Sequence, residues 1–279
     1  MLDKIMRALD LIESAENITI ILAVEAGSRA WGFESPDSDY DVRFVYVRHS
    51  DFYMSIDDGR DVIDHYHKQP YIQGTEFDDP LLDITGWDIR KALQLMRKAN
   101  PQLQEWLHSP ISYVTGQRVA LQKLSAEIDR FEPVYAFYRD MAKNNFRTYL
   151  QGDMVRYKKY LYVIRPLLAA QWVRSYRTFP PVCFRDLFET IIVQYETTYP
   201  ELRGAIERLL AKKAEASELA DAPRGPALHE WIEWEFQRKS IQLNDPESDP
   251  TQDLNSYFRE IVYGSQLLRQ WPNNVRTGR

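Results

Sequence analysis

Cysteine is nearly absent from this chain, since Cys183 is the only one among 279 residues. A lone thiol excludes a disulfide framework within the chain and any metal cluster built from several thiolates. The sequence also lacks the run of about 18 apolar residues that a membrane-spanning helix requires. The N-terminal stretch shows no basic segment followed by an unbroken apolar one, so we see no secretion signal. These absences predict a cytoplasmic protein that does not enter a membrane.

An excess of positive charge is also missing, because the net charge is -6. This argues against a uniformly basic surface for nucleic acid. The charge is uneven, however: residues 139–177 contain nine Lys or Arg against two Asp. Hydrophobic residues make up 44% of the chain and charged residues 27%, which is typical of a globular protein. An acidic region combined with a basic helical segment is a layout suited to handling phosphate groups.

The apolar periodicity changes along the chain. Up to about residue 115 it predicts helices at 3–14, 86–100 and 101–109, strands at 18–26 and 40–47, and weaker strands at 61–67 and 80–85. Beyond that point it predicts helices only, at 117–129, 134–150, 153–177, 184–196, 199–220, 226–242 and 252–270. We therefore expect an α/β (α+β) domain with a mixed sheet over residues 1–115 and an all-α domain over residues 116–279, with the boundary near 111–117.

The chemistry is concentrated in the stretch "AVEAGSRAWGFESPDSDYDVRFVYV". Gly27 and Ser28 follow directly after the first expected strand, where a glycine lets the backbone approach a phosphate and a helical turn directs N–H groups at it. Asp39 and Asp41 are two residues apart at the start of the next strand. Side chains at i and i+2 of a strand point the same way. Two such carboxylates suit Mg²⁺ bound together with phosphate oxygens.

Two arginines accompany these residues. Arg29 is next to Ser28, and it either contacts a phosphate or offsets nearby acidic residues. By strand alternation Arg43 shares a face with Asp41, while Val42, Phe44 and Tyr46 occupy the other. Arg43 therefore either orients the carboxylates or contacts substrate.

The segment "GSRAWGFESPDSDYDVRF" resembles the Gly-Ser … Asp-x-Asp signature of the DNA polymerase beta-like nucleotidyltransferase superfamily. The segments "LLDITGWDIRKALQLMRKANPQLQEWLHSP" and "YKKYLYVIRPLLA" resemble its RNA-ligase-associated branch of predicted nucleotidyltransferases (RlaP, with YcgL-type relatives). The resemblance covers residues 20–115 well and residues 130–190 less specifically.

This resemblance implies a template-independent transfer of a nucleoside monophosphate from a nucleoside triphosphate to a hydroxyl, by two-metal catalysis. Asp39 and Asp41 would hold Mg²⁺, with two ions expected and Mn²⁺ as an alternative metal. For the third carboxylate we choose Asp83 in "LLDI", which would share the first metal and accept the hydroxyl proton. Asp61 and Asp64 are the rival choices.

The helical part offers positive partners for a triphosphate. Lys159, Tyr162 and Arg165 are spaced at i, i+3 and i+6, so they lie near one face of the expected helix. This basic-aromatic stripe either binds nucleotide as the domain closes over it, or is a solvated face with Tyr162 in the core. Pro166 should kink or end the helix at Arg165.

Several alternatives stay open. The resemblance suggests an RNA end as acceptor, while a protein hydroxyl, as in AMP transfer by toxin–antitoxin systems, and a small molecule also remain. From another class, the same fold could be a non-catalytic nucleotide-binding or partner-binding module. His65 and His67 could share a strand face as zinc ligands, although no third ligand accompanies them, and an edge strand is the preferred interpretation. The nucleotide preference and the oligomeric state are not indicated.

Overall fold

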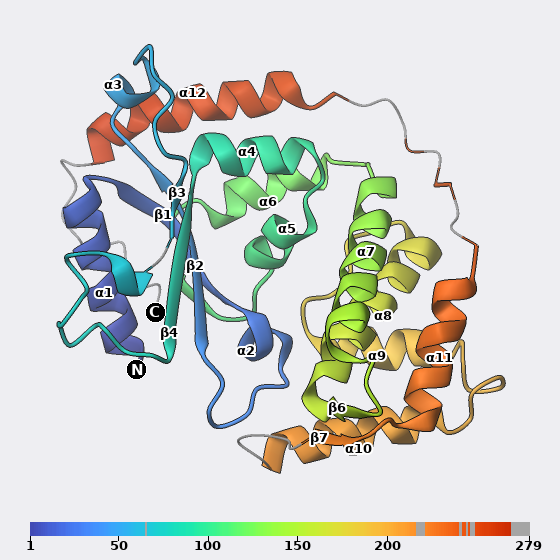
Figure 1. Ribbon diagram of the computed structural model, residues 1–279. Coiled ribbons are helices and arrows are strands. Elements are labelled where there is room, and N and C mark those ends of the chain that lie inside the picture. The colour runs from blue at the N-terminus through green and yellow to red at the C-terminus, as the bar shows by residue number, and fades with distance from the viewer. Residues whose placement is uncertain (65, 216–220, 240–241, 244, 246–248, 269–279) are drawn as a thin grey trace. The chain divides into compact units, whose positions relative to one another are not determined.

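The computed structural model describes residues 1–64, 66–215, 221–239, 242–243, 245 and 249–268 (Figure 1). They form two compact units that are interleaved in sequence. The sheet unit contains Met1–Ala30, Asp39–Asp129 and the C-terminal helix, and the helical unit contains Trp31–Ser38 and the described part of Arg130–Pro246. The predicted division into separate domains at residues 115 and 116 stays a prediction. The predicted fold class, a mixed-sheet α/β part followed by a helical part, is confirmed.

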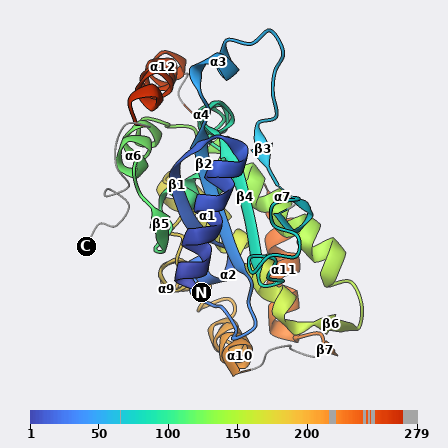
Figure 2. The same cartoon turned by 90° about the vertical axis from the view of Figure 1, so that its left-hand side faces the viewer.

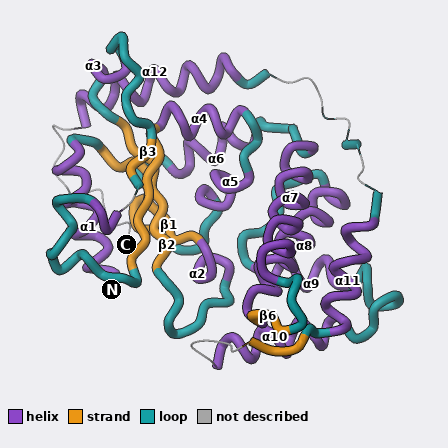
Figure 3. Tube along the Cα trace, in the orientation of Figure 1, coloured by secondary structure: helices purple, strands orange, loops and turns teal. Residues whose placement is uncertain are grey.

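A mixed sheet with the strand order β3-β4-β2-β1-β5 forms the centre of the sheet unit (Figure 3). β1 is antiparallel to β2 and β5, β2 is parallel to β4, and β3 is antiparallel to β4. The strands are β1 (Thr19–Ala26), β2 (Tyr40–Val47), β3 (Val62–Ile63), β4 (Leu82–Asp88) and β5 (Ser112–Val114).

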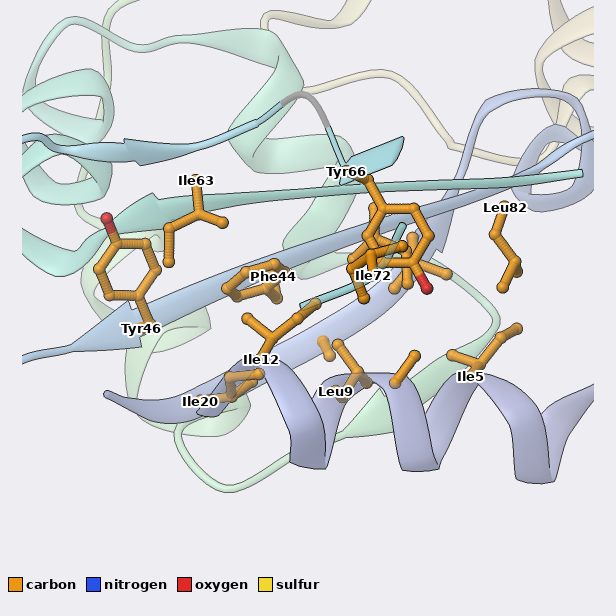
Figure 4. Close-up of a cluster of buried hydrophobic side chains, with 14 of the residues drawn as sticks. Ile5, Leu9, Ile12, Ile20, Phe44, Tyr46, Ile63, Tyr66, Ile72 and Leu82 are labelled. Carbon is orange, nitrogen blue, oxygen red and sulfur yellow. The ribbon is translucent and has the colours of Figure 1, made fainter. Parts of the chain in front are cut away.

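Helices cover both faces of this sheet, with α1 on one face and α4, α5 and α6 on the other (Figures 1 and 2). On α1, Ile5, Leu9 and Ile12 recur at helical spacing, and they are buried together with Phe44 and Tyr46 of β2 (Figure 4). Burying one apolar face of each element supplies most of the stability of such a layer. The helices of this unit are α1 (Leu2–Glu16), α2 (Gly27–Trp31, whose last residue is assigned to the helical unit), α3 (Ser50–Tyr53), α4 (Ile89–Arg97), α5 (Pro101–Leu107), α6 (Arg118–Ala126) and α12 (Thr251–Leu268), with the 3-10 turn η1 (Tyr66–Lys68).

Two local predictions in this unit are wrong. The helix expected from Gly86 begins at Ile89 instead, because residues 86–88 continue β4 beside β2 and Asp88 caps the helix by accepting a hydrogen bond from the Arg90 N–H at 2.8 Å. The strand expected over 61–67 shortens to β3, and His67 lies in η1 with its Nδ1 2.9 Å from Asp78 Oδ1. His65 lies outside the described residues.

The helical unit is built from α7 (Glu132–Tyr149), α8 (Leu161–Tyr176), α9 (Phe184–Ile192), α10 (Leu202–Glu215) and α11 (Pro226–Gln237), with the 3-10 turn η2 (Tyr157–Tyr160) and a ribbon of β6 (Met154–Arg156) and β7 (Asp221–Pro223). The helix predicted from residue 153 therefore begins only at Leu161, because β6 and η2 take its first residues. The helix predicted over 226–242 ends at Gln237 instead, and the parts of the helices predicted to reach residues 220 and 270 extend beyond the described residues. No helix among the residues described is both long and apolar enough to cross a membrane.

A buried carboxylate joins three segments of the helical unit. Glu235 is fully buried, and its oxygens accept hydrogen bonds from Gln171 at 2.9 Å, Tyr195 at 2.5 Å and Arg238 at 2.8 Å. Because a buried charge is tolerated only when it is paired and hydrogen-bonded, this network accounts for its presence between α8, the turn after α9, and α11.

Of the two outcomes expected at Pro166, the end of the helix at Arg165 is wrong, and a kink there stays a prediction. Pro166 lies inside α8, which continues to Tyr176. A proline has no N–H, so the Tyr162 carbonyl four residues earlier loses its helical partner. The Asn145 side chain, on α7, donates a hydrogen bond to this carbonyl at 2.8 Å. The neighbouring helix thus replaces the missing bond.

We predict that Asn145→Ala lowers the free energy of unfolding by about 1–3 kcal/mol, because the Tyr162 carbonyl is left without its partner. Urea denaturation followed by circular dichroism measures the loss. In a Pro166→Ala background residue 166 regains its N–H, so the same Asn145→Ala change should cost clearly less. Equal costs in the two backgrounds would contradict this explanation.

Candidate functional site

Two carboxylates meet at neighbouring strands of the sheet. β2 and β4 run parallel, and their register places Asp41 opposite Asp83. One guanidinium nitrogen, Arg43 Nη2, donates to Asp41 Oδ1 at 2.9 Å and to Asp83 Oδ2 at 2.7 Å. Because Asp41 Oδ1 and Asp83 Oδ2 accept hydrogen bonds from the same nitrogen, the distance between them is at most the sum of these two hydrogen-bond lengths. Of the two roles predicted for Arg43, this geometry favours orienting the carboxylates.

The environment of Asp41 is short of positive charge. Burial raises the pKa of the Asp41 carboxyl above its usual value, Arg43 lowers it, and the negative charges of Asp83 and Asp39 raise it further. Asp39 lies in the exposed loop just before β2. An additional cation would relieve this repulsion. The three predicted metal ligands are thus close enough to influence one another.

Gly27 is in close contact with this carboxylate. It adopts φ 62, and a Cβ built on it would lie 2.0 Å from Asp41 Oδ2. The residue therefore needs both the left-handed conformation and the absence of a side chain. Ser28 is buried at the start of α2. The predicted sequence of strand, glycine and helical turn is present, while phosphate binding by Gly27 and Ser28 stays a prediction.

A buried acid behind the site was not singled out from the sequence. Glu25 on β1 is 1% exposed, and its Oε1 accepts a hydrogen bond from the Asp41 N–H at 2.8 Å. Its Oε2 accepts one from the Tyr113 hydroxyl. Burial raises the pKa of Glu25, and these hydrogen bonds lower it. The signal that could have revealed this residue is a charged side chain within the apolar strand "ITIILAVEA".

Arg29 turns toward the same strand end. Its Nε donates to the Asp39 carbonyl at 3.1 Å, and its guanidinium lies over the Tyr40 ring at 3.7 Å. Its positive charge also lowers the pKa of Glu25. These contacts hold the loop before β2 in place, and a phosphate contact by Arg29 stays a prediction.

The rival third carboxylates have other partners. Asp61 accepts a hydrogen bond from Lys91 Nζ at 3.0 Å, and Asp64 is paired with Arg60. The geometry thus favours Asp83 as the third carboxylate.

The donor chemistry of the site fits magnesium. Among the described residues, no three acidic, histidine or cysteine side chains are already arranged around one point as metal ligands. Mg²⁺ does not require such a cage, because it usually takes one or two carboxylates together with water and substrate phosphates. Asp41 and Asp83 supply two hard oxygen donors side by side, and Arg43 balances part of their charge.

The basic-aromatic stripe is assembled within the helical unit. Lys159 on η2 places its ammonium 4.4 Å from the centre of the Tyr149 ring and 4.8 Å from that of Tyr162. Arg165 is buried with its guanidinium 4.3 Å from the Trp31 ring centre, and Trp31 packs edge-on against Tyr162. The structure therefore brings Lys159, Tyr162 and Arg165 together around aromatic rings. Nucleotide binding by this stripe stays a prediction.

We predict that Gly27→Ala destabilises the protein by more than the same change at Gly74. Gly74 has φ 71 and nothing within 4 Å of its Cβ position, so Gly74→Ala measures the cost of the left-handed backbone alone, about 1 kcal/mol. The added clash with Asp41 is present only at Gly27. Urea denaturation of both variants measures the difference. Equal losses would show that the contact between Gly27 and Asp41 does not matter.

Comparisons with known proteins place the chain in a family. Residues 1–260 match the family model described as the RNA repair pathway DNA polymerase beta family, RlaP. An uncharacterized protein, YcgL of Bacillus subtilis (strain 168), is 40% identical over 267 residues, which cover 94% of this chain and 96% of that protein. No solved structure matches. On these two matches, the chain belongs to the RNA repair pathway DNA polymerase beta family.

Proposed function

We propose that this protein is a nucleotidyltransferase that transfers a nucleoside monophosphate from a nucleoside triphosphate to an acceptor hydroxyl, with release of pyrophosphate. The observation that carries the proposal is the side-by-side placement of Asp41 and Asp83 on parallel strands, with Gly27 in contact with Asp41. The membership of this chain in a DNA polymerase beta family supports the proposal.

Each residue has a distinct task in this proposal. Asp41 and Asp83, with Asp39 beside them, would hold Mg²⁺. When bound, Mg²⁺ neutralises charge on the triphosphate and lowers the pKa of the attacking hydroxyl. Asp83, which is more exposed than Asp41, would accept the hydroxyl proton. Arg43 keeps the two carboxylates aligned, so the reaction gains from positioning and electrostatics.

Two further features hold Asp41 in place. Glu25 fixes the backbone of Asp41 through its N–H, and Gly27 leaves space for the carboxylate. A side chain that is held from both sides loses little conformational freedom when substrate binds. Gly27 and Ser28 at the end of β1 are the proposed contacts for the phosphates of the substrate.

The favoured acceptor is the end of an RNA strand, because the family is described as belonging to an RNA repair pathway. A protein hydroxyl and a small molecule are the alternative acceptors. Incubation of the protein with Mg²⁺, each labelled nucleoside triphosphate and an RNA oligonucleotide tests the proposal. Label on the RNA with equimolar pyrophosphate supports it. Pyrophosphate without labelled RNA points to another acceptor, and no turnover with any acceptor contradicts it.

We predict that Asp41→Asn and Asp83→Asn each lower the rate of transfer by about a hundredfold or more, since each removes charge that stabilises the reacting groups. Asp61→Asn and Asp64→Asn are the matched controls, because these acids pair with Lys91 and Arg60 instead. Their rates should stay within about twofold of the unmodified protein. Loss of activity in Asp64→Asn with full activity in Asp83→Asn would show that the third carboxylate is misassigned.

We predict that Arg43→Gln makes the melting temperature depend more strongly on Mg²⁺. Without the guanidinium, Asp41 and Asp83 repel each other at close range, and a bound cation relieves this repulsion. Differential scanning fluorimetry at rising Mg²⁺ concentration measures the shift. The shift should disappear when Asp41→Asn and Asp83→Asn are added to Arg43→Gln. An equal shift with and without these carboxylates would mean that Mg²⁺ binds elsewhere.

A further inference from the structure

A buried lysine in the helical unit has no acidic side chain bonded to it. Lys213 on α10 is 4% exposed, and its ammonium lies 4.3 Å from the centre of the Phe33 ring. Within the described part of the chain, it forms neither a hydrogen bond nor an ion pair. Lysine is almost never this buried unless it is paired, because removing its charge from water is costly. A bound ligand with negative charge would explain the burial of this side chain.

Charges of both signs act on Lys213 from its surroundings. The pKa of Lys213 is lowered to about 8, mainly by burial and then by the charges of Lys158 and Lys159, while Glu34 and Asp37 act in the opposite direction. Lys158 and Lys159 lie on η2, and the two acids lie in the segment 31–38. Neither acid forms an ion pair with Lys213 in the part that the structure describes.

Lys159 shows the same pattern. Its ammonium is held over the rings of Tyr149 and Tyr162, and burial, followed by the charges of Lys158 and Arg156, lowers its pKa. An aromatic ring stabilises a cation but carries no net charge, so the positive charge is not neutralised, whereas a carboxylate would neutralise it. Both ammonium groups therefore keep the capacity to bind an anion.

We propose that Lys213 and Lys159 form a binding site for a chain of phosphate groups within the helical unit, with Lys158 adding positive charge beside them. Several like charges held together suit a ligand that carries more than one negative charge. Lysine binds phosphate as a point charge, so the site requires no special orientation of the oxygens. The choice of a phosphate chain rests on the proposed nucleotidyl transfer, while the site itself needs neither metal nor catalysis.

The sequence contains a signal for this residue. Lys213 follows Leu209 by four positions and Ile206 by seven, so it lies on the buried face of α10. A charged residue at a position with this spacing stands out. Its neighbour Lys212 is exposed, and its ammonium lies 5.1 Å from the Tyr157 ring centre. Lys212 is therefore a matched control of the same type on the same helix.

Calorimetric titration of the full chain with inorganic tripolyphosphate, without added metal, tests the site. We expect Lys213→Met to weaken binding by about ten- to one-hundred-fold, since a charged contact is lost. Lys212→Met should leave binding within about twofold of the unmodified protein. Methionine places an uncharged chain in the buried position, so this variant should melt no lower than the unmodified protein. Unchanged tripolyphosphate binding in Lys213→Met, or no binding by the unmodified protein, overturns the proposal.

Proton uptake separates an anion contact from a structural role. At pH 8 the free Lys213 amine is partly deprotonated, and a bound anion raises its pKa again, so binding should take up roughly half a proton. Titrations in buffers with different ionisation enthalpies measure this uptake. It should be lost in Lys213→Met and kept in Lys212→Met. Uptake that persists in Lys213→Met contradicts the assignment of Lys213.

The phosphate chain has two sources, which further titrations distinguish. Weaker binding of both tripolyphosphate and ATP by Lys213→Met assigns the site to the nucleotide. Weaker binding of tripolyphosphate and of a 5′-phosphorylated oligoribonucleotide, with ATP and the unphosphorylated oligoribonucleotide unaffected, assigns it to the acceptor strand. Either result supports a phosphate site. If transfer assays fail while tripolyphosphate binding depends on Lys213, the proposed function falls and this site stands.

Discussion

The parallel pairing of β2 with β4 brings two carboxylates together that would otherwise avoid each other. Because Asp41 is opposite Asp83 in the register, the hydrogen bonds of the sheet maintain a repulsion that the side chains alone would relax. Arg43, two residues along the same face, offsets it by bonding to both acids. Arg43 thus offsets part of the negative charge of this partly buried cluster. The proposed chemistry depends on this balance.

The surroundings of Asp41 show how the fold keeps it in place. Glu25 accepts a hydrogen bond from the backbone N–H of Asp41. Gly27 lies against the Asp41 carboxylate, which is possible because glycine has no side chain. Both residues belong to the end of β1 and the turn that follows it. A single strand end thus supplies the backbone anchor and the space for the acid, as well as the proposed phosphate contacts. For this reason the short segment between β1 and β2 contains several residues of the proposed site.

The helical unit contains buried charges of two kinds. Glu235 is surrounded by donors from Gln171, Tyr195 and Arg238, so its burial is explained by structure alone. Among the described residues, Lys213 lies over an aromatic ring, with like and opposite charges near it but no ion pair to either acid, so its burial is not explained in that way. The cost of desolvating a charge is the same kind of penalty in both places. In the first case the protein compensates it internally, and in the second the compensation points to a ligand.

Local sequence alone determined most of the helices and the strands β1, β2 and β4, the Gly-Ser turn, and the face shared by Asp41 and Arg43, because these depend on periodicity and turn chemistry between near neighbours. It did not reveal the short strands β5, β6 and β7. It failed at Pro166, where a distant side chain, Asn145, restores the lost hydrogen bond. It also missed the buried charges of Glu25 and Lys213, and its choice of Asp83 as third carboxylate stays a prediction that the register of β2 with β4 favours. Only tertiary structure decided which residues are neighbours and which charges are buried, since strand register and helix packing bring together residues far apart in the chain.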